Sequence, residues 1–494
     1  MDLKKLITLC NPVKVSGPEP HDLGALTHNS RAVEENGVFI ALQGTRVDGH
    51  AFINDAIDNG AAVIISEKKV RSDGNVCRLL VDDTRSLMGP LAQAFEGNPA
   101  EKLTIVGITG TNGKTTVATL TYQVLQSLGT KPSLLGTIAK RIDDKVLDSR
   151  LTTADPIELA RDMRRMVEAG STHLVMEVSS HALDQQRVDG IAFNVAAFTN
   201  LSHDHLDYHP SMEAYANSKK RLFDGLKTQA TAVINDDDEW APLMSRDCMA
   251  KKLLFGFENM SPIDCRILKN SHQGLTIEVD DMIIQSPLVG KFNAYNIAQT
   301  YLICQALGFN SKKIADAIAD APGASGRLQR VEIEDKAHQP LVLVDYAHTP
   351  GALKNVLETL VNLKESKQKL HVIFGCGGDR DKTKRPEMAE IAENYADRVI
   401  ITSDNPRSED PDAIIDDAMK GFRHPDQVQR ITDRREAIEQ TINEADEDTI
   451  ILIAGKGHET YQEINGEQLP FDDREVAVHA LANRNGNLKS PEVC

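Results

Sequence analysis

The sequence lacks the usual features of secreted, membrane-spanning and nucleic-acid-binding proteins. Its seven cysteines are scattered and include no C-x-x-C pair, which argues against a disulfide framework or a zinc knuckle and indicates reduced thiols. No run of 18 apolar residues occurs, and the first residues contain no long apolar stretch, so we expect neither membrane insertion nor export. Acidic residues outnumber basic ones by 73 to 55, which argues against non-specific nucleic-acid binding. We expect a cytoplasmic protein that takes small-molecule substrates.

The chain's 494 residues suffice for about three domains, and its strand and helix patterns predict an α/β protein. The strands "GVFIAL" and "AAVIIS", with the helical "HAFINDAIDNG" between them, predict a small N-terminal domain over residues 1–98. The segments "LTIVGIT", "THLVMEVSS", "VAAFTNLS" and "QATAVIND" alternate with helices and predict a central parallel sheet in residues 99–328. A linker near residue 325 leads to a third domain over residues 329–494.

The third domain repeats the alternation of strands and helices. Its four predicted strands, "PLVLVDY", "KLHVIFG", "RVIITSD" and "TIILIAG", each run into a polar loop. Ligands of open α/β sheets bind at the carboxyl ends of the strands. The sequence therefore predicts a binding site where these four loops meet.

The segment "GITGTNGKTT", residues 107–116, follows a predicted strand and opens a predicted helix. In this context the backbone N–H groups of a Gly-rich turn and of a helix N-terminus face phosphate oxygens. Lys114 would neutralise the β- and γ-phosphates, and the Thr115 hydroxyl would reach Mg²⁺. The strict pattern G-x-x-x-x-G-K-[ST] is not met, because Ile108 occupies the first glycine position. The alternative, a plain strand–helix turn, is disfavoured by the Gly-Lys-Thr-Thr run.

The form "GTNGKTT" resembles the phosphate loop of the Mur ligases and the folylpolyglutamate synthetases. Eight further motifs match the Mur ligases in order, along nearly the whole chain: "MEVSSH", "FTNLSHDHLDYH", "GKFNAYN", "SGR", "VDYAHTP", "FGCGGDRDKTKRP", "DNPR" and "AGKGHE". The resemblance implies a three-domain architecture, with an N-terminal domain for UDP-MurNAc-dipeptide, a central ATP-binding P-loop domain and a Rossmann-like C-terminal domain for the amino acid. Within the family, the chain most resembles the members that add the third peptide residue to UDP-N-acetylmuramoyl-L-alanyl-D-glutamate. That step belongs to peptidoglycan synthesis, which serves cell shape and division.

The resemblance implies that ATP activates a carboxylate as an acyl phosphate, which an amine then attacks. Cations are needed between the carboxylate and the γ-phosphate, since both are negatively charged. The implied catalytic residues are Lys114, Lys219 and His205. The implied metal ligands are Thr115 and Glu177 for Mg²⁺, and His205 for a second metal. Lys219 matches a carbamylated lysine of the family, although the neighbouring Lys220 leaves the register slightly open. From the residues alone Glu177 could be a surface carboxylate, and a structural zinc site in "SHDHLDYH" has no cysteine partner nearby.

The remaining substrate residues rest on the resemblance, and each alone would be an unremarkable loop or capping residue. The implied ATP-binding residues are Gly110, Thr111, Asn112, Gly113, Lys114, Thr115, Thr116, Asn293, Asn296, Arg327 and Asp345. The implied UDP-MurNAc-dipeptide residues are Ser30, Thr152, Thr153, Ser179, Gln185 and Arg187, with the loop at 43–50 beside the uridine. From the residues alone, the two asparagines could cap a helix and Asp345 could begin a turn.

Arg407 bears on which amine is added. meso-Diaminopimelate is lysine with a second carboxylate, and a planar cation suits that carboxylate. By itself Arg407 could equally be a surface arginine that offsets nearby acids, but "DNPR" resembles the diaminopimelate-adding enzymes. The implied diaminopimelate residues are Arg385, Asp404, Asn405, Pro406, Arg407, Gly455 and Glu459, with the two arginines on carboxylates and Glu459 on the far ammonium.

Three alternatives remain open at this point. The first is the same ligase adding L-lysine, and the second is a folylpolyglutamate synthetase, which the separate N-terminal domain disfavours. The third is a phosphate-loop regulatory protein without ligase activity. Nothing in the sequence demands more than a monomer.

Overall fold

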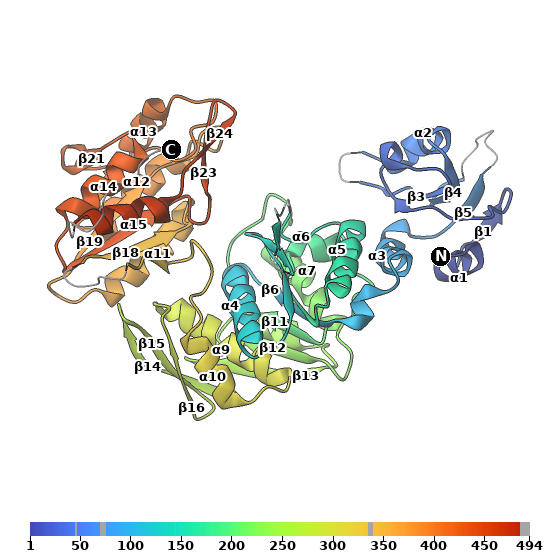
Figure 1. The fold of residues 1–494 in the computed structure, drawn as a ribbon, viewed down its shortest axis with the longest axis horizontal. Helices are drawn as coiled ribbons and strands as arrows, with labels where there is room; N and C mark the ends of the chain where they lie inside the picture. Colours follow the sequence, from blue (N-terminus) through green and yellow to red (C-terminus); the bar gives the residue numbers. More distant parts are fainter. Residues whose placement is uncertain are drawn as a thin grey trace. The chain divides into compact units, whose positions relative to one another are not determined.

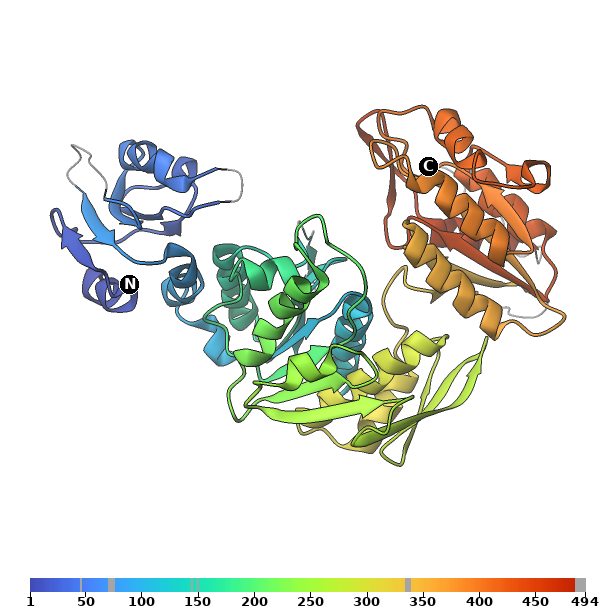
Figure 2. The same cartoon turned by 180° about the vertical axis from the view of Figure 1, so that it is seen from behind.

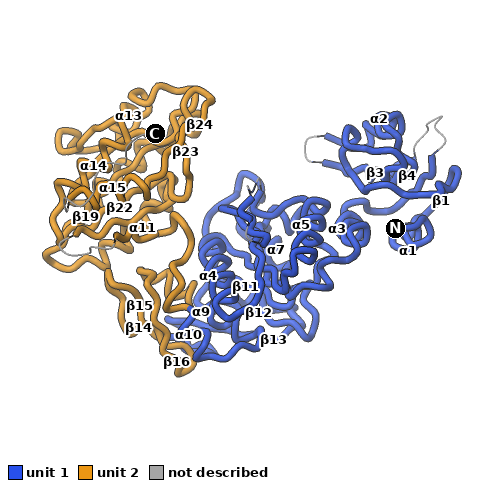
Figure 3. The backbone as a smooth tube through the Cα atoms, in the orientation of Figure 1, with its two compact units in different colours: residues 1–265, 298–317 blue, residues 266–297, 318–494 orange. Residues whose placement is uncertain are grey.

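The computed structural model describes residues 1–494 except 45–46, 70–75, 144, 148, 150, 334–338 and 485–494. The chain divides into two compact units (Figure 3). Unit 1 comprises Met1–Cys265 with Ala298–Ala317, and unit 2 comprises Arg266–Ile297 with Ile318–Cys494. Both units contain sheets flanked by helices, which confirms the predicted α/β class (Figure 1). No helix of the described residues is long and apolar enough to cross a bilayer.

The first sheet of unit 1 has the strand order β1-β5-β4-β3-β2, with β2 to β5 parallel and β1 antiparallel at one edge. The two apolar runs predicted as strands form β3 and β4, which are buried almost throughout. The elements of this part are α1 (Leu3–Cys10), β1 (Lys14–Ser16), β2 (Leu26–Thr27), η1 (Ser30–Ala32), β3 (Gly37–Ile40), η2 (Gly49–Phe52), α2 (Ile53–Asp58), β4 (Ala61–Ser66), β5 (Cys77–Leu80) and α3 (Thr84–Phe95).

The second sheet has eleven strands, in the order β16-β15-β14-β13-β12-β11-β6-β10-β7-β8-β9, of which β13 to β9 belong to unit 1. The strands from β13 to β7 are parallel, as predicted, whereas β8 and β9 add an antiparallel edge that the sequence did not predict. Its elements in unit 1 are η3 (Pro99–Lys102), β6 (Thr104–Thr109), α4 (Lys114–Ser127), β7 (Pro132–Leu135), β8 (Lys140–Ile142), β9 (Lys145–Leu147), α5 (Pro156–Glu168), β10 (His173–Glu177), α6 (Ser180–Asp184), β11 (Val195–Phe198), α7 (Met212–Asp224), β12 (Thr231–Asn235), α8 (Ala241–Ser245) and β13 (Lys251–Gly256).

Unit 2 contains a hairpin of antiparallel strands and a six-stranded sheet with the order β17-β18-β22-β19-β20-β21. Every strand of that sheet except β17 is parallel to its neighbours, as in a Rossmann-like domain. The strands are β14 (Ile263–Ser271), β15 (Gly274–Val279), β16 (Met282–Ser286), β17 (Gln329–Arg330), β18 (Leu341–Asp345), β19 (Lys369–Phe374), β20 (Arg398–Ile401), β21 (Gln429–Arg430), β22 (Thr449–Ala454), β23 (Tyr461–Ile464) and β24 (Glu467–Pro470). The helices are α9 (Lys291–Ala306) and α10 (Ser311–Ala319), which carry residues of both units, α11 (Pro350–Leu363), α12 (Lys384–Tyr395), α13 (Pro411–Met419), η4 (Pro425–Gln427), α14 (Arg434–Glu444) and α15 (Asp473–Arg484).

Helices cover both faces of the six-stranded sheet (Figure 2), and a separate apolar core lies on each face. Helices α11, α12 and α13 pack on one face, and α14 and α15 pack on the other. Because both faces are buried, the central strands are apolar at nearly every position, as expected for a parallel sheet. Because β18, β22, β19 and β20 are parallel, the loops at their carboxyl ends lie along one edge of the sheet, as predicted from the sequence.

Candidate active site

The predicted phosphate loop connects β6 to α4 in unit 1. Gly113 precedes the helix with φ 85°, and no side chain caps the helix N-terminus. Gly110 has φ 146°, and a Cβ built there would lie 1.8 Å from the Thr199 hydroxyl, so only glycine fits. Lys114 Nζ donates to the carbonyls of Gly110 and Thr111, each at 2.9 Å. The loop thus combines an uncapped helix N-terminus with a lysine folded over it, an arrangement suited to a polyphosphate.

Glu177, at the end of β10, is directed towards the start of α4. Its side chain is 1% exposed, and Oε2 accepts a hydrogen bond of 3.0 Å from the Thr115 hydroxyl. Oε1 accepts one of 2.8 Å from the Thr137 backbone N–H. Among the described residues no lysine, arginine or histidine forms an ion pair with this buried carboxylate. A buried carboxylate beside a hydroxyl is an oxygen donor set that fits a hard cation such as Mg²⁺.

Lys219 in α7 lies beside the same loop. Its side chain is 1% exposed, and Nζ donates to the Gly110 carbonyl at 2.8 Å and lies 4.6 Å from the centre of the Tyr215 ring. No carboxylate of the described residues lies within ion-pair distance. Burial, with a further contribution from the charge of Lys114, holds the pKa of Lys219 well below its usual value. A neutral lysine is the form that reacts with CO₂, so the environment fits the implied carbamate.

His205 lies near the loop, and its neighbouring histidines are packed rather than free. Its ring centre is 6.0 Å from that of Tyr215 and 5.0 Å from that of His181. His205 has φ 53°, the left-handed region, and is exposed to solvent. His209 is 3% exposed, and its Nε2 lies 3.0 Å from the Ser180 hydroxyl. Burial, with further contributions from the charges of His205 and His209, lowers the pKa of His181.

Four of the implied UDP-MurNAc-dipeptide residues form one hydrogen-bonded group. The Thr153 hydroxyl donates to the Glu177 carbonyl at 2.9 Å and accepts from the Ser179 N–H at 3.1 Å. Arg187 donates from Nη1 to the Thr153 carbonyl at 2.8 Å and from Nη2 to Gln185 Oε1 at 2.7 Å. Burial lowers the pKa of Arg187. The Thr153 hydroxyl joins this group to the strand that carries Glu177, so the residues implied for the dipeptide and for the metal are connected by hydrogen bonds.

The other two residues of this set lie in separate places. The Thr152 hydroxyl is 3.0 Å from that of Thr137, which itself contacts Glu177. Ser30 is buried in the part of unit 1 that contains the first sheet. Its backbone carbonyl accepts a hydrogen bond of 3.0 Å from the Asn59 side chain. Residues 45–46 of the predicted uridine loop lie outside the described part of the chain. The assignment of Ser30 and this loop to uridine stays a prediction.

In unit 2 the implied nucleotide residues form two pairs. Asn293 donates to the Val289 carbonyl at 2.8 Å, and Asn296 donates to Asn293 Oδ1 at 2.9 Å. Asp345 accepts from the backbone of Leu328 at 2.6 Å and of Ala347 at 2.8 Å.

Arg327 lies next to this carboxylate. Its guanidinium carbon lies 5.1 Å from the centre of the Tyr346 ring, and its buried Nε has no hydrogen-bond partner among the residues that the structure describes. Burial raises the pKa of Asp345, and the charge of Arg327 opposes that shift. The turn expected at Asp345 is present, and the orphaned N–H of Arg327 leaves capacity for a ligand.

Arg407 follows β20 in the loop that the sequence singled out. Its backbone is left-handed, with φ 52°, and its N–H donates to the Glu463 carbonyl at 2.9 Å. Its Nη1 donates to the Gly378 carbonyl at 2.8 Å, and its Nε is 2.9 Å from Glu463 Oε2. The side chain is 21% exposed. The guanidinium is therefore held on two sides by the protein, and Nη2 has no partner among the described residues.

The loops after β20 and β22 contact one another directly. Asn405 donates to Glu459 at 2.8 Å and accepts from Lys456 Nζ at 3.0 Å. Lys456 is fully buried and also pairs with Glu459 at 3.1 Å. Asp404 Oδ2 is buried and has no hydrogen-bond partner in the described part of the chain, and a Cβ built on Gly455 would lie 2.4 Å from it. The predicted amino-acid residues thus cluster, with one carboxylate oxygen left for a donor.

Arg385 differs from the other predicted residues, because the protein already satisfies its charge. It is 1% exposed and pairs with Glu409 at 2.8 Å and with Asp417 at 2.9 Å. Arg380, five residues earlier, is exposed and donates only to the Asp379 carbonyl, with no ion pair among the described residues.

Comparison with known proteins decides the family. Three family profiles match successive parts of the chain: the "Mur ligase family, catalytic domain" at residues 23–96, the "Mur ligase middle domain" at 108–304, and the "Mur ligase, glutamate ligase domain" at 326–457. A Cytophaga hutchinsonii protein named UDP-N-acetylmuramoyl-L-alanyl-D-glutamate–2,6-diaminopimelate ligase is 42% identical over 97% of this chain and 99% of its own length. The chain belongs to the Mur ligase family.

Solved Mur ligases share the fold. A structure titled as a UDP-N-acetylmuramoyl-L-alanyl-D-glutamate–2,6-diaminopimelate ligase has a TM-score of 0.73 and 34% identity, and the match covers 97% of this chain and 99% of that one. The MurF ligase of Thermotoga maritima in complex with ADP has a TM-score of 0.55 at 20% identity over 93% and 96% of the two chains, which shows a common fold alone. This Mur ligase therefore has the three-domain architecture that the motifs implied.

The structure brings two residues of this Mur ligase into the site that the sequence reasoning missed. Lys456 lies inside the quoted motif "AGKGHE" but was not assigned a role, and it contacts both Asn405 and Glu459. Arg380 lies in "GCGGDRD", the loop that also contacts Arg407. One signal in the sequence could have identified both residues. Lys456 and Arg380 lie in polar loops that follow predicted parallel strands, the same reason for which Arg385 was considered.

Proposed function

We propose that this Mur ligase adds meso-diaminopimelate to UDP-N-acetylmuramoyl-L-alanyl-D-glutamate with hydrolysis of ATP to ADP and phosphate, in the cytoplasm. The D-glutamate carboxylate attacks the γ-phosphate to give an acyl phosphate. The amine of diaminopimelate then attacks the acyl carbon, and phosphate leaves as the amide forms. The relatives that match over the full length carry this activity in their names.

The residues of unit 1 fit the activation step. The uncapped start of α4 and Lys114 would hold the ATP phosphates, and Arg187 would hold the dipeptide near Glu177. Mg²⁺ held by Thr115 and Glu177, with a second metal ion at His205, would neutralise the charge between the two anions. Lys219, carried as its carbamate, would become an acceptor beside the loop. From unit 2, Asn293, Asn296, Arg327 and Asp345 would contact the nucleotide.

Arg407 carries the choice of diaminopimelate over lysine. Its guanidinium is fixed by Gly378 and Glu463, so Nη2 can meet a carboxylate without loss of side-chain freedom at the moment of binding. Arg380 is the second cation available in the neighbouring loop. We propose that Arg385 supports the loops of the amino-acid site and does not contact the substrate, because its charge is already paired with Glu409 and Asp417. Glu459 and the orphaned oxygen of Asp404 are the acceptors for an ammonium group.

The deciding experiment is ATP-dependent phosphate release with UDP-N-acetylmuramoyl-L-alanyl-D-glutamate and either meso-diaminopimelate or L-lysine. Turnover with diaminopimelate and not lysine is expected. Turnover with lysine alone would keep the ligase and remove the role given to Arg407. No turnover with either amine would overturn the proposed substrate.

A further inference from the structure

One guanidinium joins the starts of the two loops that hold the incoming amino acid. Arg434, the first residue of α14, is 1% exposed, and its Nη2 donates to the Ala454 carbonyl at 3.0 Å. Its Nη1 donates to the Ser403 carbonyl at 3.3 Å. Ala454 ends β22 and Ser403 follows β20, two strands that are separated in the sheet by β19. Arg434 is thus a direct bridge between strands that do not pair with each other.

The bridge is itself held rigidly. Asp473, at the start of α15, is fully buried and accepts from Arg434 Nε and Nη2, each at 2.7 Å. Burial opposes the charged form of Arg434, yet the Asp473 carboxylate, with further attraction from Asp404 and Glu459, raises the pKa of Arg434. A planar fork that makes two parallel bonds to a carboxylate has its orientation fixed. The two remaining donor contacts therefore set where the carbonyls of Ser403 and Ala454 lie.

The positions set by this bridge are one residue from the binding residues. Asp404 and Asn405 follow Ser403, and Gly455 follows Ala454. A Cβ on Gly455 would lie 2.4 Å from Asp404 Oδ2, so the two loops are packed without spare room. A shift of either strand end therefore displaces an amino-acid contact, and a misplacement of about 1 Å can cost roughly 100-fold in rate.

We propose that Arg434, with Asp473, is a positioning residue for the amino-acid site: it fixes the register between the loops at 404–407 and 455–459 without touching substrate. This inference rests on the proposed function, since it assigns the effect to binding of the amine. It predicts that disturbing Arg434 weakens binding of the amino acid more than binding of the UDP substrate. Most of the implied dipeptide residues belong to the second sheet of unit 1, whereas Asp345, which is implied at the nucleotide, pairs with Ala454 in the six-stranded sheet.

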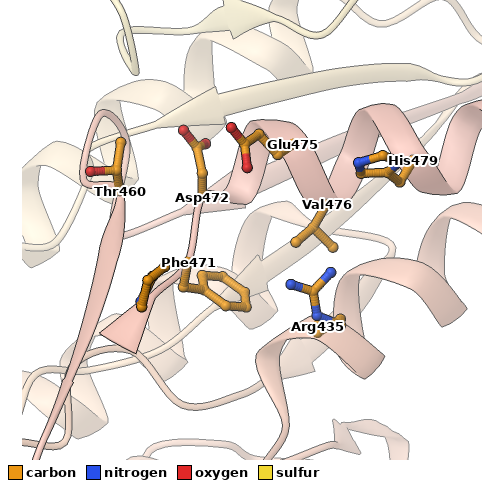
Figure 4. A pocket seen from close by; sticks show the side chains of 8 residues that line it. Arg435, Thr460, Phe471, Asp472, Glu475, Val476 and His479 are labelled. Carbon is orange, nitrogen blue, oxygen red and sulfur yellow. The ribbon is translucent and has the colours of Figure 1, made fainter. Parts of the chain in front are cut away.

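The neighbouring Arg435 provides a matched control. It belongs to the same helix, but its side chain is 52% exposed and lines a surface cavity of about 300 Å³ (Figure 4). There its guanidinium carbon lies 5.6 Å from the centre of the Phe471 ring. None of the residues that line this cavity was assigned to a substrate, and Arg435 has no hydrogen bond to either loop among the described contacts.

The test compares Arg434→Lys, Asp473→Glu and Arg435→Lys in the full-length enzyme, by phosphate release with each substrate varied in turn. Lysine keeps the charge but loses the fork, and glutamate keeps the ion pair but moves the guanidinium by one methylene. We expect Arg434→Lys and Asp473→Glu to raise KM for meso-diaminopimelate about 10- to 100-fold. The KM for the UDP substrate should stay within about threefold, and Arg435→Lys should behave as wild type.

Hydrogen exchange separates positioning from general destabilisation. Faster exchange in Arg434→Lys should be confined to the two loops and the strand ends that precede them. Unchanged KM for the amino acid, or equal changes in the KM values for the amino acid and the UDP substrate with exchange raised throughout the domain, would overturn the inference. An Arg434→Lys protein that does not fold leaves Asp473→Glu to decide by the same criteria. A wild-type enzyme silent with diaminopimelate would instead overturn the proposed function.

Discussion

Replacing Arg407 tests whether its guanidinium selects the amine. The side chain makes a 2.8 Å hydrogen bond to the Gly378 carbonyl and a 2.9 Å ion pair with Glu463, which aim the remaining donor. Lysine retains the charge but offers neither the fork nor that aim. Losing one or two charge-assisted hydrogen bonds costs about 2–4 kcal/mol. That is roughly 30- to 1,000-fold in kcat/KM for meso-diaminopimelate, at about 1.4 kcal/mol for each tenfold.

The backbone at this position needs its own control. Arg407 has φ 52°, a region that asparagine tolerates better than most residues, so Arg407→Asn removes the cation with little added strain. Arg423→Lys serves as the surface comparison, because Arg423 is 64% exposed and pairs with Glu393 in the same domain. The assay is steady-state phosphate release with meso-diaminopimelate and L-lysine as competing amines.

The ratio of the two specificity constants is the decisive quantity. L-Lysine lacks the distal carboxylate, so its kcat/KM should change by less than about threefold in Arg407→Lys. The ratio of kcat/KM for diaminopimelate to kcat/KM for lysine therefore falls by nearly the whole factor by which kcat/KM for diaminopimelate falls. Equal losses for both amines, or no loss for diaminopimelate, would refute the assignment and leave Arg407 as a residue that only supports its loop.

Three further outcomes are expected. Lys219→Met should lower phosphate release by at least about 100-fold. The melting temperature should stay unchanged or rise, because the substitution removes a buried amine that has no carboxylate partner among the described residues. Short carboxylates such as acetate should restore activity, and a lack of rescue would argue against the carbamate. Glu177→Gln should raise the Mg²⁺ concentration for half-maximal activity about 10- to 100-fold, measured by Mg²⁺ titration, and an unchanged requirement would place the metal elsewhere. Hydrogen bonds from Arg385 hold the pKa of Glu409 at about 2 rather than 4.5, so its stabilisation is complete above pH 4.5 and is lost as the pH falls towards 2. Glu409→Gln should therefore lower the melting temperature at pH 7 by more than at pH 3, and an equal deficit at both values would contradict the pair's role.

The sequence predicted those parts of the fold that depend on local patterns. The apolar run 61–66 forms β4 and the run 449–454 forms β22, because continuous β-branched segments suit strands buried on both faces. The phosphate loop was equally readable, since glycines at fixed spacing before a helix have a local cause. The antiparallel strands β8 and β9 were missed, because they are three residues each and carry lysines that obscure any alternation.

Side-chain partners were harder to predict than backbone elements. Arg380 lies in the polar loop after β19, and Arg385 lies five residues later at the start of α12. The sequence favoured Arg385 as the residue that binds a substrate carboxylate. The structure buries Arg385 against Glu409 and Asp417, which lie 24 and 32 residues away in the chain. No local rule identifies such partners, because they depend on how α12 and α13 pack on the sheet. The role predicted for Arg385 stays a prediction, and its geometry favours support of the loops.

Two buried lysines show why environment, and not residue type, decides chemistry. Lys219 is 1% exposed and Lys456 is fully buried. Lys456 donates to Asn405 and pairs with Glu459, so its charge is compensated and its nitrogen is committed as a donor. Lys219 donates only to a backbone carbonyl among the described contacts, and burial depresses its pKa. CO₂ reacts only with an unprotonated amine, so of these two lysines the one beside the phosphate loop is the one that can become a carbamate. Lys456 instead contacts Asn405 and Glu459, so its nitrogen is committed to joining the loops that follow β20 and β22.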